Sequence, residues 1–383
     1  MELTRKRTEL KKLRGYEFYQ SLGSPKKVLA PMVQMSELPF RLYMRKQGVE
    51  LCYSPMMISK HFHSSRRFRK RNLHFHQKDR PLFVQFAGND PNVVLKSAQY
   101  VENKCDAIDF NMGCPQQRVA GKGHYGSFLL DTEEDRQLCV EIVKKLDQNL
   151  MVPVTCKIRL IPSSEDKLVG DIEKTITFAK QLEKAGCAIL AVHGRTRFNK
   201  GRTMTKTNWG AIARVKESLT IPVIANGSIK TFQDYKDCLK ESKADAVMVA
   251  MGCLDNPLLF LNKGNDGELN WEKERRVCTK EFLEFVFEQQ KEKQLLVVKE
   301  KTIRNHIYHI VGKQFFRAPQ LRERLSSIEE MVKAVTELDQ VLTQKEKEKK
   351  NHEIENEKEN EKEIKVEQIE NNQKELEIEK EKL

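Results

Sequence analysis

The sequence predicts a (β/α)8 barrel, and three observations support this prediction. Short apolar runs rich in Val, Ile, Ala and Cys alternate with longer helix-like stretches, and the alternation occurs eight times within about 230 residues. Runs that are apolar throughout are typical of a parallel sheet covered on both faces by helices. A doubly wound open sheet is the alternative, although it would rarely need eight regular units. The expected strands are 28–31, 50–54, 81–86, 106–111, 153–158, 188–193, 221–226 and 245–250.

Local start signals predict helices between these strands. Asp90 precedes Pro91, so a carboxylate stands before a residue that is preorganised for the first helical turn. Asp131 precedes an acidic first turn, and Thr231 is followed three residues later by Asp234. We therefore expect helices to begin near these three positions.

The alternation stops at Trp271, and a helical domain is predicted from there. Apolar residues recur at helical spacing within 271–293, 297–312 and 320–342. Beyond Thr343 the chain is mostly Lys, Glu, Asn and Gln, which cannot form a core. The expected organisation is a basic N-terminal segment (1–25), the barrel (26–264), a C-terminal helical bundle domain (265–342) and a charged low-complexity tail, disordered or partly helical (343–383).

The charge distribution points to a polyanion as partner. The net charge is +13, but residues 343–383 hold ten Lys against fourteen Glu, a charge of −4, which leaves +17 for residues 1–342. We expect nucleic acid rather than a membrane, because no run approaches bilayer-spanning length and no amphipathic anchor is present. A cationic surface that only keeps the protein soluble is the alternative.

Cysteine usage indicates a reducing compartment. The nine cysteines include no CxxC pair, and the chain is too long for a fold stapled by disulfides. The basic first residues contain no apolar stretch, so we expect no secretory signal. A cytoplasmic location is expected, with the nucleus left open.

Cys114 is the candidate for chemistry. The apolar run 107–112 ends in Gly113-Cys114-Pro115-Gln116, which delivers a thiol to the rim of the sheet. Glycine allows a tight turn there, and proline fixes the backbone just after the sulfur. Most cysteines in such a protein are small buried hydrophobes, and we expect this of most of the others.

Polar or glycine-rich groups also end most of the other predicted strands. In a barrel of this class, the C-terminal ends of the strands carry the site. Each side chain alone has a structural explanation, but together they indicate a polar ligand across the barrel mouth. The set is Pro31, Met32, Val33, Gln85, Asn111, Lys157, Arg159, His193, Gly194, Arg195, Asn226, Gly227, Ser228, Ala250, Met251 and Gly252.

Flavin mononucleotide (FMN) meets the demands of this set. The loops after the last two strands, at Asn226-Gly227 and Gly252, offer backbone amides to a phosphate. Lys157 and His193 are donors under the middle of the ligand, and the Gln85 amide can pair with the edge of a heterocycle.

Two further segments have weaker signals. Residues 121–126 match the G-x-G-x-x-G pattern, but no strand directly precedes them, so a glycine-hinged loop beside Cys114 explains them better than a dinucleotide site.

Residues 61–76 hold four histidines and a dense group of Arg and Lys at 66–71. Neighbouring cations disfavour a metal there; RNA phosphates are the expected target, and a solvated basic loop is the alternative.

These residues resemble the tRNA-dihydrouridine synthases over roughly residues 26–342. The matching stretches are APMVQMSELPFR, PLFVQFAGNDP, DAIDFNMGCPQ, GHYGSFLLD, VTCKIR, VHGRTR, IPVIANGSI and AMGCLDNPLLF. NMGCPQ followed by GHYGSFLLD is similar to the eukaryotic branch that acts on positions 16 and 17 of the tRNA D-loop. The resemblance implies an FMN barrel, a helical domain that binds tRNA, NADPH or NADH as reductant, and a cysteine that donates a proton.

The resemblance also implies roles for individual residues. Cys114 takes the place of the proton donor, and Asn111, Arg159 and Arg195 are assigned to the substrate. Many relatives have Arg where Met251 stands, so backbone amides are expected to hold the phosphate here. The cofactor positions are Pro31, Met32, Val33, Gln85, Lys157, His193, Asn226, Gly227, Ser228, Ala250, Met251 and Gly252.

The chemistry is consistent with these residues. The 5,6-double bond of uracil is conjugated to the C4 carbonyl, so hydride from reduced flavin is expected at C6 and negative charge develops on C5 and O4. A thiol with an ordinary pKa near 8.5 is largely protonated at neutral pH and can protonate C5.

Two other functions are considered. One is a flavin barrel that acts on a free pyrimidine, resembling dihydroorotate dehydrogenases, although such a substrate needs no basic body. The other is an RNA-binding protein without activity on an inherited barrel. We further expect a monomer that binds no metal and no membrane.

Overall fold

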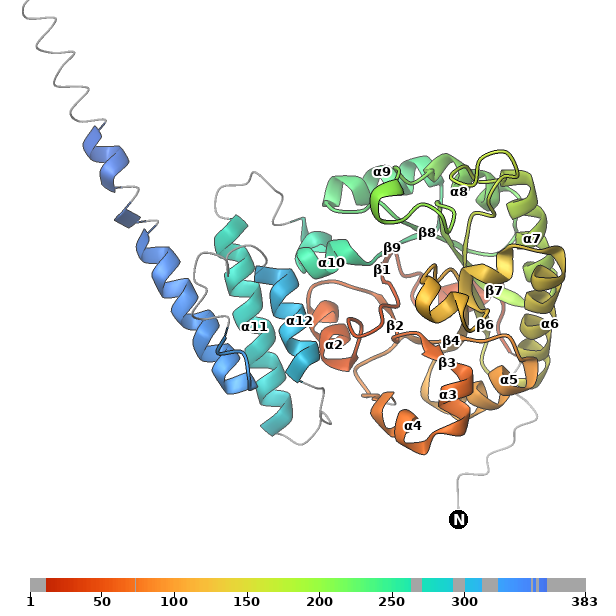
Figure 1. The fold of residues 1–383 in the computed structure, drawn as a ribbon, viewed down its shortest axis with the longest axis horizontal. Coiled ribbons are helices and arrows are strands. Elements are labelled where there is room, and N and C mark those ends of the chain that lie inside the picture. Colours follow the sequence, from red (N-terminus) through yellow and green to blue (C-terminus); the bar gives the residue numbers. More distant parts are fainter. Residues whose placement is uncertain are drawn as a thin grey trace, which may run out of the picture. The chain divides into compact units, whose positions relative to one another are not determined.

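The computed structural model contains a closed barrel of eight parallel strands, which confirms the predicted fold class (Figure 1). The structure describes residues 12–72, 74–262, 271–291, 300–311, 323–345, 347–348 and 351–356. Neighbouring strands follow the order β2-β1-β9-β8-β7-β6-β5-β4, and pairing of β2 with β4 closes the ring. The strands are β1 (Lys27–Leu29), β2 (Leu51–Tyr53), β4 (Leu82–Ala87), β5 (Ala107–Met112), β6 (Val154–Arg159), β7 (Cys187–His193), β8 (Val223–Asn226) and β9 (Ala246–Val249).

All eight predicted strands are present, with ends within two residues of the expected ones. An additional short strand, β3 (Met57–Ile58), pairs with the C-terminal end of β4. Residues 59–61, directly after β3, and residues 88–90, directly after β4, therefore lie beside each other and line one pocket.

Helices surround the barrel between these strands (Figure 1). Asp90 caps its helix by accepting hydrogen bonds from the amides of Asn92 and Val93, as predicted. Thr231 likewise caps α9. The bounds are α1 (Gly15–Ser21), α2 (Leu38–Lys46), α3 (Ser59–Ser64), α4 (Arg66–Asn72), α5 (Pro91–Gln99), α6 (Glu133–Asn149), α7 (Ile172–Lys184), α8 (Trp209–Glu217), α9 (Phe232–Ser242), α10 (Met251–Asp255), α11 (Trp271–Lys291) and α12 (Glu300–Val311).

Helix α6 begins one residue later than Asp131 suggests. The cap is Thr132, whose hydroxyl accepts a hydrogen bond from the amide of Asp135. Asp131 instead forms an ion pair with Arg197 at 2.7 Å. A carboxylate and a hydroxyl are both good caps, so the sequence alone did not separate the two neighbours.

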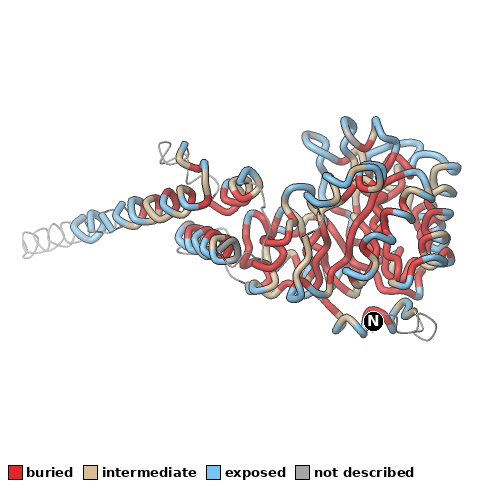
Figure 2. Tube along the Cα trace, turned by 90° about the horizontal axis from the view of Figure 1, so that it is seen from below, coloured by how far each residue is buried: buried red, intermediate tan, exposed pale blue. Residues whose placement is uncertain are grey.

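The N-terminal half of the barrel interior is apolar. Figure 2 shows the strands as mostly buried chain, and Tyr53, Phe83 and Met248 belong to one buried cluster. Phe18 of α1 joins this cluster and stacks on Phe83, with ring centroids 5.9 Å apart. Helix α1 thus contributes to the packing of this interior.

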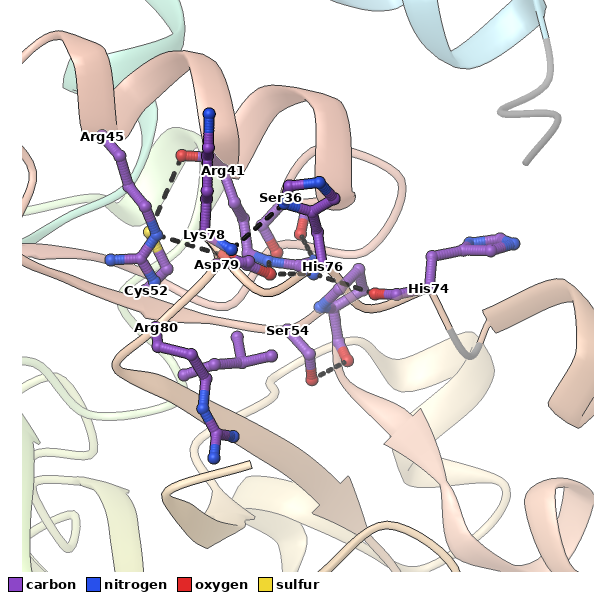
Figure 3. Close-up of polar contacts among 12 residues, drawn as sticks. Ser36, Arg41, Arg45, Cys52, Ser54, His74, His76, Lys78, Asp79 and Arg80 are labelled. Atoms are coloured by element: carbon purple, nitrogen blue, oxygen red, sulfur yellow. Dashed lines mark hydrogen bonds and ion pairs between the residues drawn. The ribbon is translucent and has the colours of Figure 1, made fainter. Parts of the chain in front are cut away.

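A buried ion pair ties α2 to the segment that returns from α4 (Figure 3). Arg41 donates to the fully buried Asp79 from Nε and Nη2, at 2.9 and 2.6 Å. Arg45 reaches the other carboxylate oxygen at 3.1 Å. Arg41 Nη2 also donates to the carbonyl of His74. These bonds fix the chain between the basic helix α4 and strand β4.

The chain divides into two compact units, Met1–Gly312 and Lys313–Leu383. Helices α11 and α12 belong to the first unit. Phe282 of α11 lies against Phe40 of α2, with ring centroids 6.0 Å apart, and His306 of α12 stacks on Phe40 at 4.3 Å. The expected boundary between barrel and helical domain at 264/265 stays a prediction.

The second unit contains a helix over 328–345. The apolar periodicity predicts a start of this helix at 320, but the described residues 323–327 form a turn. Ser327 caps the helix by accepting from the amide of Glu330. Residues 1–11, most of the tail, and Lys299, Lys313, Arg317 and Arg322 of the predicted RNA-binding region lie outside the described residues.

Among the described helices, none combines the length and apolar character needed to cross a membrane.

Candidate active site

A pocket of about 620 Å³ lies at the C-terminal mouth of the barrel. This volume falls within the range of roughly 300–1,000 Å³ that is usual for small-molecule sites. Eleven of the sequence-predicted site residues line the pocket. They are Pro31, Lys157, Arg159, His193, Arg195, Asn226, Gly227, Ser228, Ala250, Met251 and Gly252.

Lys157 is a buried cation near the centre of the pocket. Its Nζ donates to Oδ1 of Asn226 at 3.1 Å, and the Asn226 amide in turn donates to the carbonyl of Met248. Burial and the nearby charge of Arg159 lower the pKa of Lys157 to about 8, and the charge of Asp109 opposes this shift. Lys157 is therefore largely charged at neutral pH and can donate to an anionic edge of a ligand.

His193, the last residue of β7, and Gly227, directly after β8, lie close together. Burial and the nearby cations Arg159, Lys157 and Arg195 hold the pKa of His193 well below its ordinary value, so the ring is neutral. Gly227 has φ +117°, and a Cβ atom there would stand 2.9 Å from Nε2 of His193. Only glycine allows the backbone after β8 to approach the imidazole this closely.

Three cations gather where the loops after β7 and β8 meet. Arg195 donates from Nη2 to the hydroxyl of Ser228 at 2.8 Å, and Lys206 and Lys230 also line the pocket there. Arg195, which was assigned to the substrate, thus lies among the residues assigned to the cofactor. Met251 is 53% exposed and offers no charge.

Cys114 is the one cysteine of the nine that is not buried. Its amide and that of Gly113 both donate to Oδ1 of Asn111, at 3.0 and 3.1 Å. Arg159 donates from Nε to the carbonyl of Gly113 at 2.8 Å, which ties the turn to β6. Burial raises the pKa of Cys114, and a hydrogen bond from the amide of Gln116 lowers it in part. The thiol is therefore protonated at neutral pH.

The glycine-rich segment packs on the Cys114 turn, as the sequence predicts. Ser127 donates from its amide and hydroxyl to the carbonyl of Cys114, at 3.1 and 2.8 Å. Gly126 has φ +66°, and a Cβ atom there would stand 3.0 Å from that of Cys114. The hydroxyl of Tyr125 is buried without a hydrogen-bond partner among the described residues.

The 620 Å³ pocket is not lined by Met32, Val33, Gln85, Asn111 or Cys114. Gln85 is fully buried, with Nε2 bonded to Asp109 at 2.8 Å and Oε1 accepting from Asn111 at 2.8 Å. The Gln85 amide has two N–H donors and two acceptor lone pairs, which were expected to pair with a heterocycle. One donor and one lone pair are used within the protein instead.

A second pocket of about 680 Å³ is lined by part of the glycine-rich segment and by residues 58–61 and 88–90. Tyr125 lines it, and Tyr125 also packs with Cys114 around one apolar cluster. The rim carries Lys60, Arg118 and Lys122, whose side chains are exposed and have no hydrogen bond or ion pair with the residues described here. This rim suits an extended anion.

Four residues of the region were not predicted from the sequence. Lys206 and Lys230 lie in loops, where a cation has no distinguishing pattern. Tyr125 was considered only as part of a glycine motif. Asp109 was counted in an apolar run. Ala107, Asp109 and Asn111 are each two residues apart, so the period of two in a strand places all three on one face.

The pocket residues fit a flavin mononucleotide. A phosphate suits the Gly227 and Gly252 loops with Arg195 and Lys230 nearby, and a buried lysine and a neutral imidazole suit the ring edge. Within the described part of the chain, no three His, Cys, Asp or Glu side chains are grouped to hold a metal ion.

A family model described as "Dihydrouridine synthase (Dus)" matches residues 28–369. This chain belongs to the dihydrouridine synthase family. The resemblance inferred from the Cys114 motif and the strand ends is confirmed.

Several curated members of the family are similar to this dihydrouridine synthase chain. A mouse protein named tRNA-dihydrouridine(16/17) synthase [NAD(P)(+)]-like is 44% identical over 252 residues, which is 65% of this chain and 50% of that protein. The tRNA-dihydrouridine(16/17) synthase [NAD(P)(+)] of Schizosaccharomyces pombe is 44% identical over 66% of this chain and 61% of its own. The chain therefore spans about half to three fifths of the length of these relatives.

Two further proteins are more distantly similar to this chain. A human tRNA-dihydrouridine(20a/20b) synthase [NAD(P)+]-like protein is 34% identical over 62% of this chain and 71% of its own. The solved structure of an old yellow enzyme homologue from Zymomonas mobilis matches 64% of this chain and 89% of its own with 11% identity and a TM-score of 0.45. That similarity is too low to bear on the site.

Proposed function

We propose that this protein is a flavin-dependent tRNA-dihydrouridine synthase that reduces uridine to 5,6-dihydrouridine in the D-loop of tRNA, at position 16, 17 or both. Family membership supports the reaction, and the relatives that are 41–44% identical, whose names specify positions 16 and 17, support the site of action. The observation that carries the proposal is a protonated, partly exposed thiol at the end of β5, beside a pocket that fits FMN.

Cys114 is the proton donor in this proposal. The bound flavin supplies the hydride that reduces C6 of the uracil, with NADPH or NADH as the external reductant. The Cys114 thiol then transfers its proton to C5, which completes saturation of the 5,6-bond. Because burial raises the pKa of this thiol, it stays protonated at neutral pH and transfers its proton when negative charge develops on C5.

Arg159 and Asn111 hold the substrate while charge shifts to its carbonyl oxygens. Arg159 uses Nε on Gly113 and Nη1 on the carbonyl of Thr196, and a guanidinium has five N–H donors, so donors remain for O4. Asn111 retains one N–H after its bond to Gln85. Donors fixed in place before the reaction stabilise the developing negative charge.

The second pocket gives the RNA a place beside Cys114. A uracil can reach a barrel mouth only after it is unstacked, at a cost of a few kcal/mol. Contacts between phosphates and the free cations Lys60, Arg118 and Lys122 can offset that cost.

The test is the reaction itself. Purified full-length protein should show flavin absorbance and, with NADPH, should convert unmodified tRNA to a product in which mass spectrometry maps dihydrouridine to position 16 or 17. Colourless protein that still binds tRNA would contradict the enzyme assignment. Turnover of free uracil or orotate with none on tRNA would contradict the substrate.

A further inference from the structure

A carboxylate lies buried beneath the candidate active site. Asp109 is fully buried on the inner face of β5, between its register partners Gln85 on β4 and Thr155 on β6. Thr155 donates from its hydroxyl to Oδ1 of Asp109 at 2.7 Å, and Gln85 donates from Nε2 to Oδ2 at 2.8 Å. Neither the flavin contacts nor the proton transfer described above uses this group.

The carboxylate fixes the direction of two amide side chains in series. An ionised carboxylate only accepts hydrogen bonds, so Gln85 must turn its Nε2 toward Asp109 and its Oε1 toward Asn111. Asn111 then donates from Nδ2 to that oxygen at 2.8 Å, which leaves its own Oδ1 for the backbone. Oδ1 of Asn111 accepts from the amides of Gly113 and Cys114.

We propose that Asp109 is a positioning residue for Cys114, acting through Gln85 and Asn111 to hold the turn that presents the thiol. Asp109 touches neither the substrate nor the flavin in this proposal. The inference rests on the proposed role of Cys114 and adds a residue that sets its geometry.

The electrostatics agree with a role other than stability. Burial raises the pKa of Asp109 to about 6, against the hydrogen bonds from Thr155 and Gln85 and the charge of Lys157. Burial, and then the charge of Asp109, hold the pKa of Tyr53 on β2 well above its ordinary value. A buried charge held by two neutral donors is less favourable than an apolar side chain of similar size.

The test compares changes at the two oxygens of this carboxylate. Asp109→Leu removes the acceptor for Gln85, whereas Thr155→Val removes only the donor on the other side and is the matched control. Asp109→Asn is the conservative variant, because the Thr155 hydroxyl can accept from its amide and leave the Asn oxygen for Gln85.

Alkylation of Cys114 by iodoacetamide reports on the turn without requiring turnover. The other eight cysteines are buried, so the reaction is selective. We expect Asp109→Leu to speed alkylation, because a released turn exposes the sulfur, and to lower kcat by about 100-fold. The KM for tRNA should stay near that of the wild type. Asp109→Asn and Thr155→Val should resemble the wild type in all three quantities.

Two outcomes would overturn the proposal. One is an Asp109→Leu variant with wild-type alkylation and kcat, and the other is an equal effect of Thr155→Val, which would indicate general loss of packing. If Asp109→Leu does not fold, Gln85→Met breaks the next link and must speed alkylation in the same way. Since alkylation needs no tRNA, failure of the dihydrouridine assay would count against the proposed function alone.

Discussion

Buried charges dominate the site at the scale of single residues. Asp109 has a pKa of about 6 against an ordinary 3.8, so the native state binds its proton more readily than the unfolded state does. Stability therefore falls as pH rises from about 4 to about 6, and a cost of about 3 kcal/mol is fully present at neutral pH. Such costs are tolerated where a group serves function.

Lys157 is expected to bind the flavin in a pH-dependent manner. Its pKa of about 8 means that it loses its charge as pH rises through that value. Flavin affinity of the wild type should fall between about pH 7 and pH 9. Lys157→Ala should bind flavin weakly and show little pH dependence, as measured by flavin content after dialysis. Lys184→Ala, at an exposed position of α7, is the control. Undiminished flavin content in Lys157→Ala would refute the assignment.

Cys114 could be predicted from the sequence and Asp109 could not, for a physical reason. A thiol between Gly and Pro at a strand end is a local pattern. The role of Asp109 depends on register, because Gln85 and Thr155 come opposite it only when β4, β5 and β6 pair. The orientation of two amides is likewise a property of the assembled hydrogen-bond chain.

At the scale of elements, the basic segment after β2 forms two short helices rather than a loop. Arg69 of α4 lies over the ring of Tyr100 on the neighbouring α5 segment, 4.5 Å from its centroid. The Arg41–Asp79 ion pair fixes the chain that follows α4. The cations of α4 are therefore presented by ordered structure.

The rim of the second pocket should contribute to tRNA binding through phosphates. We expect a triple variant, Lys60→Ala with Arg118→Ala and Lys122→Ala, to weaken tRNA binding and to reduce the slope of log affinity against log salt by about two to three. The rate of flavin reduction by NADPH should not change. Fluorescence anisotropy at several salt concentrations measures the first effect.

The control for this variant changes three exposed lysines on outer helices, Lys180→Ala, Lys184→Ala and Lys240→Ala. This control also removes three positive charges, but from helices that lie away from the barrel mouth. Equal losses of affinity and slope in both variants would show that only net charge matters. An unchanged slope in the rim variant would exclude phosphate contacts at this pocket.

Strand positions were predicted more reliably than helix ends. Apolar runs mark strands because burial on both faces requires them. A helix end depends on which of several adjacent polar residues forms the cap. Thr132 rather than Asp131 caps α6, and Ser327 caps a helix that periodicity alone would start at 320.

At the scale of the whole molecule, the first unit contains the barrel and the helices α11 and α12. These two helices follow Trp271, where the alternation of strands and helices in the sequence stops. Composition marks that change, but Phe40 of α2 packs against both Phe282 and His306. Such contacts between residues far apart in sequence leave no local signal. Domain limits are thus less predictable from the chain than strands are.

The charge of the chain also acts as a whole. A net +13 with an acidic tail leaves a strongly basic remainder, which attracts RNA over distances set by ionic strength. The second pocket and Cys114 lie on the barrel-mouth side of that basic body. Under the proposed function, attraction of tRNA and chemistry on one base are consecutive events on one surface.

The most direct measurement is dihydrouridine formation per tRNA by the wild type, Cys114→Ser and Cys114→Ala, each with its flavin content and tRNA affinity recorded. We predict that both variants keep flavin and tRNA binding. Turnover should fall by about 100- to 10,000-fold in Cys114→Ala. It should fall less in Cys114→Ser, because a hydroxyl can still donate a proton although it is a weaker acid than a thiol. Turnover by Cys114→Ala at close to the wild-type rate would contradict the role of Cys114 as proton donor.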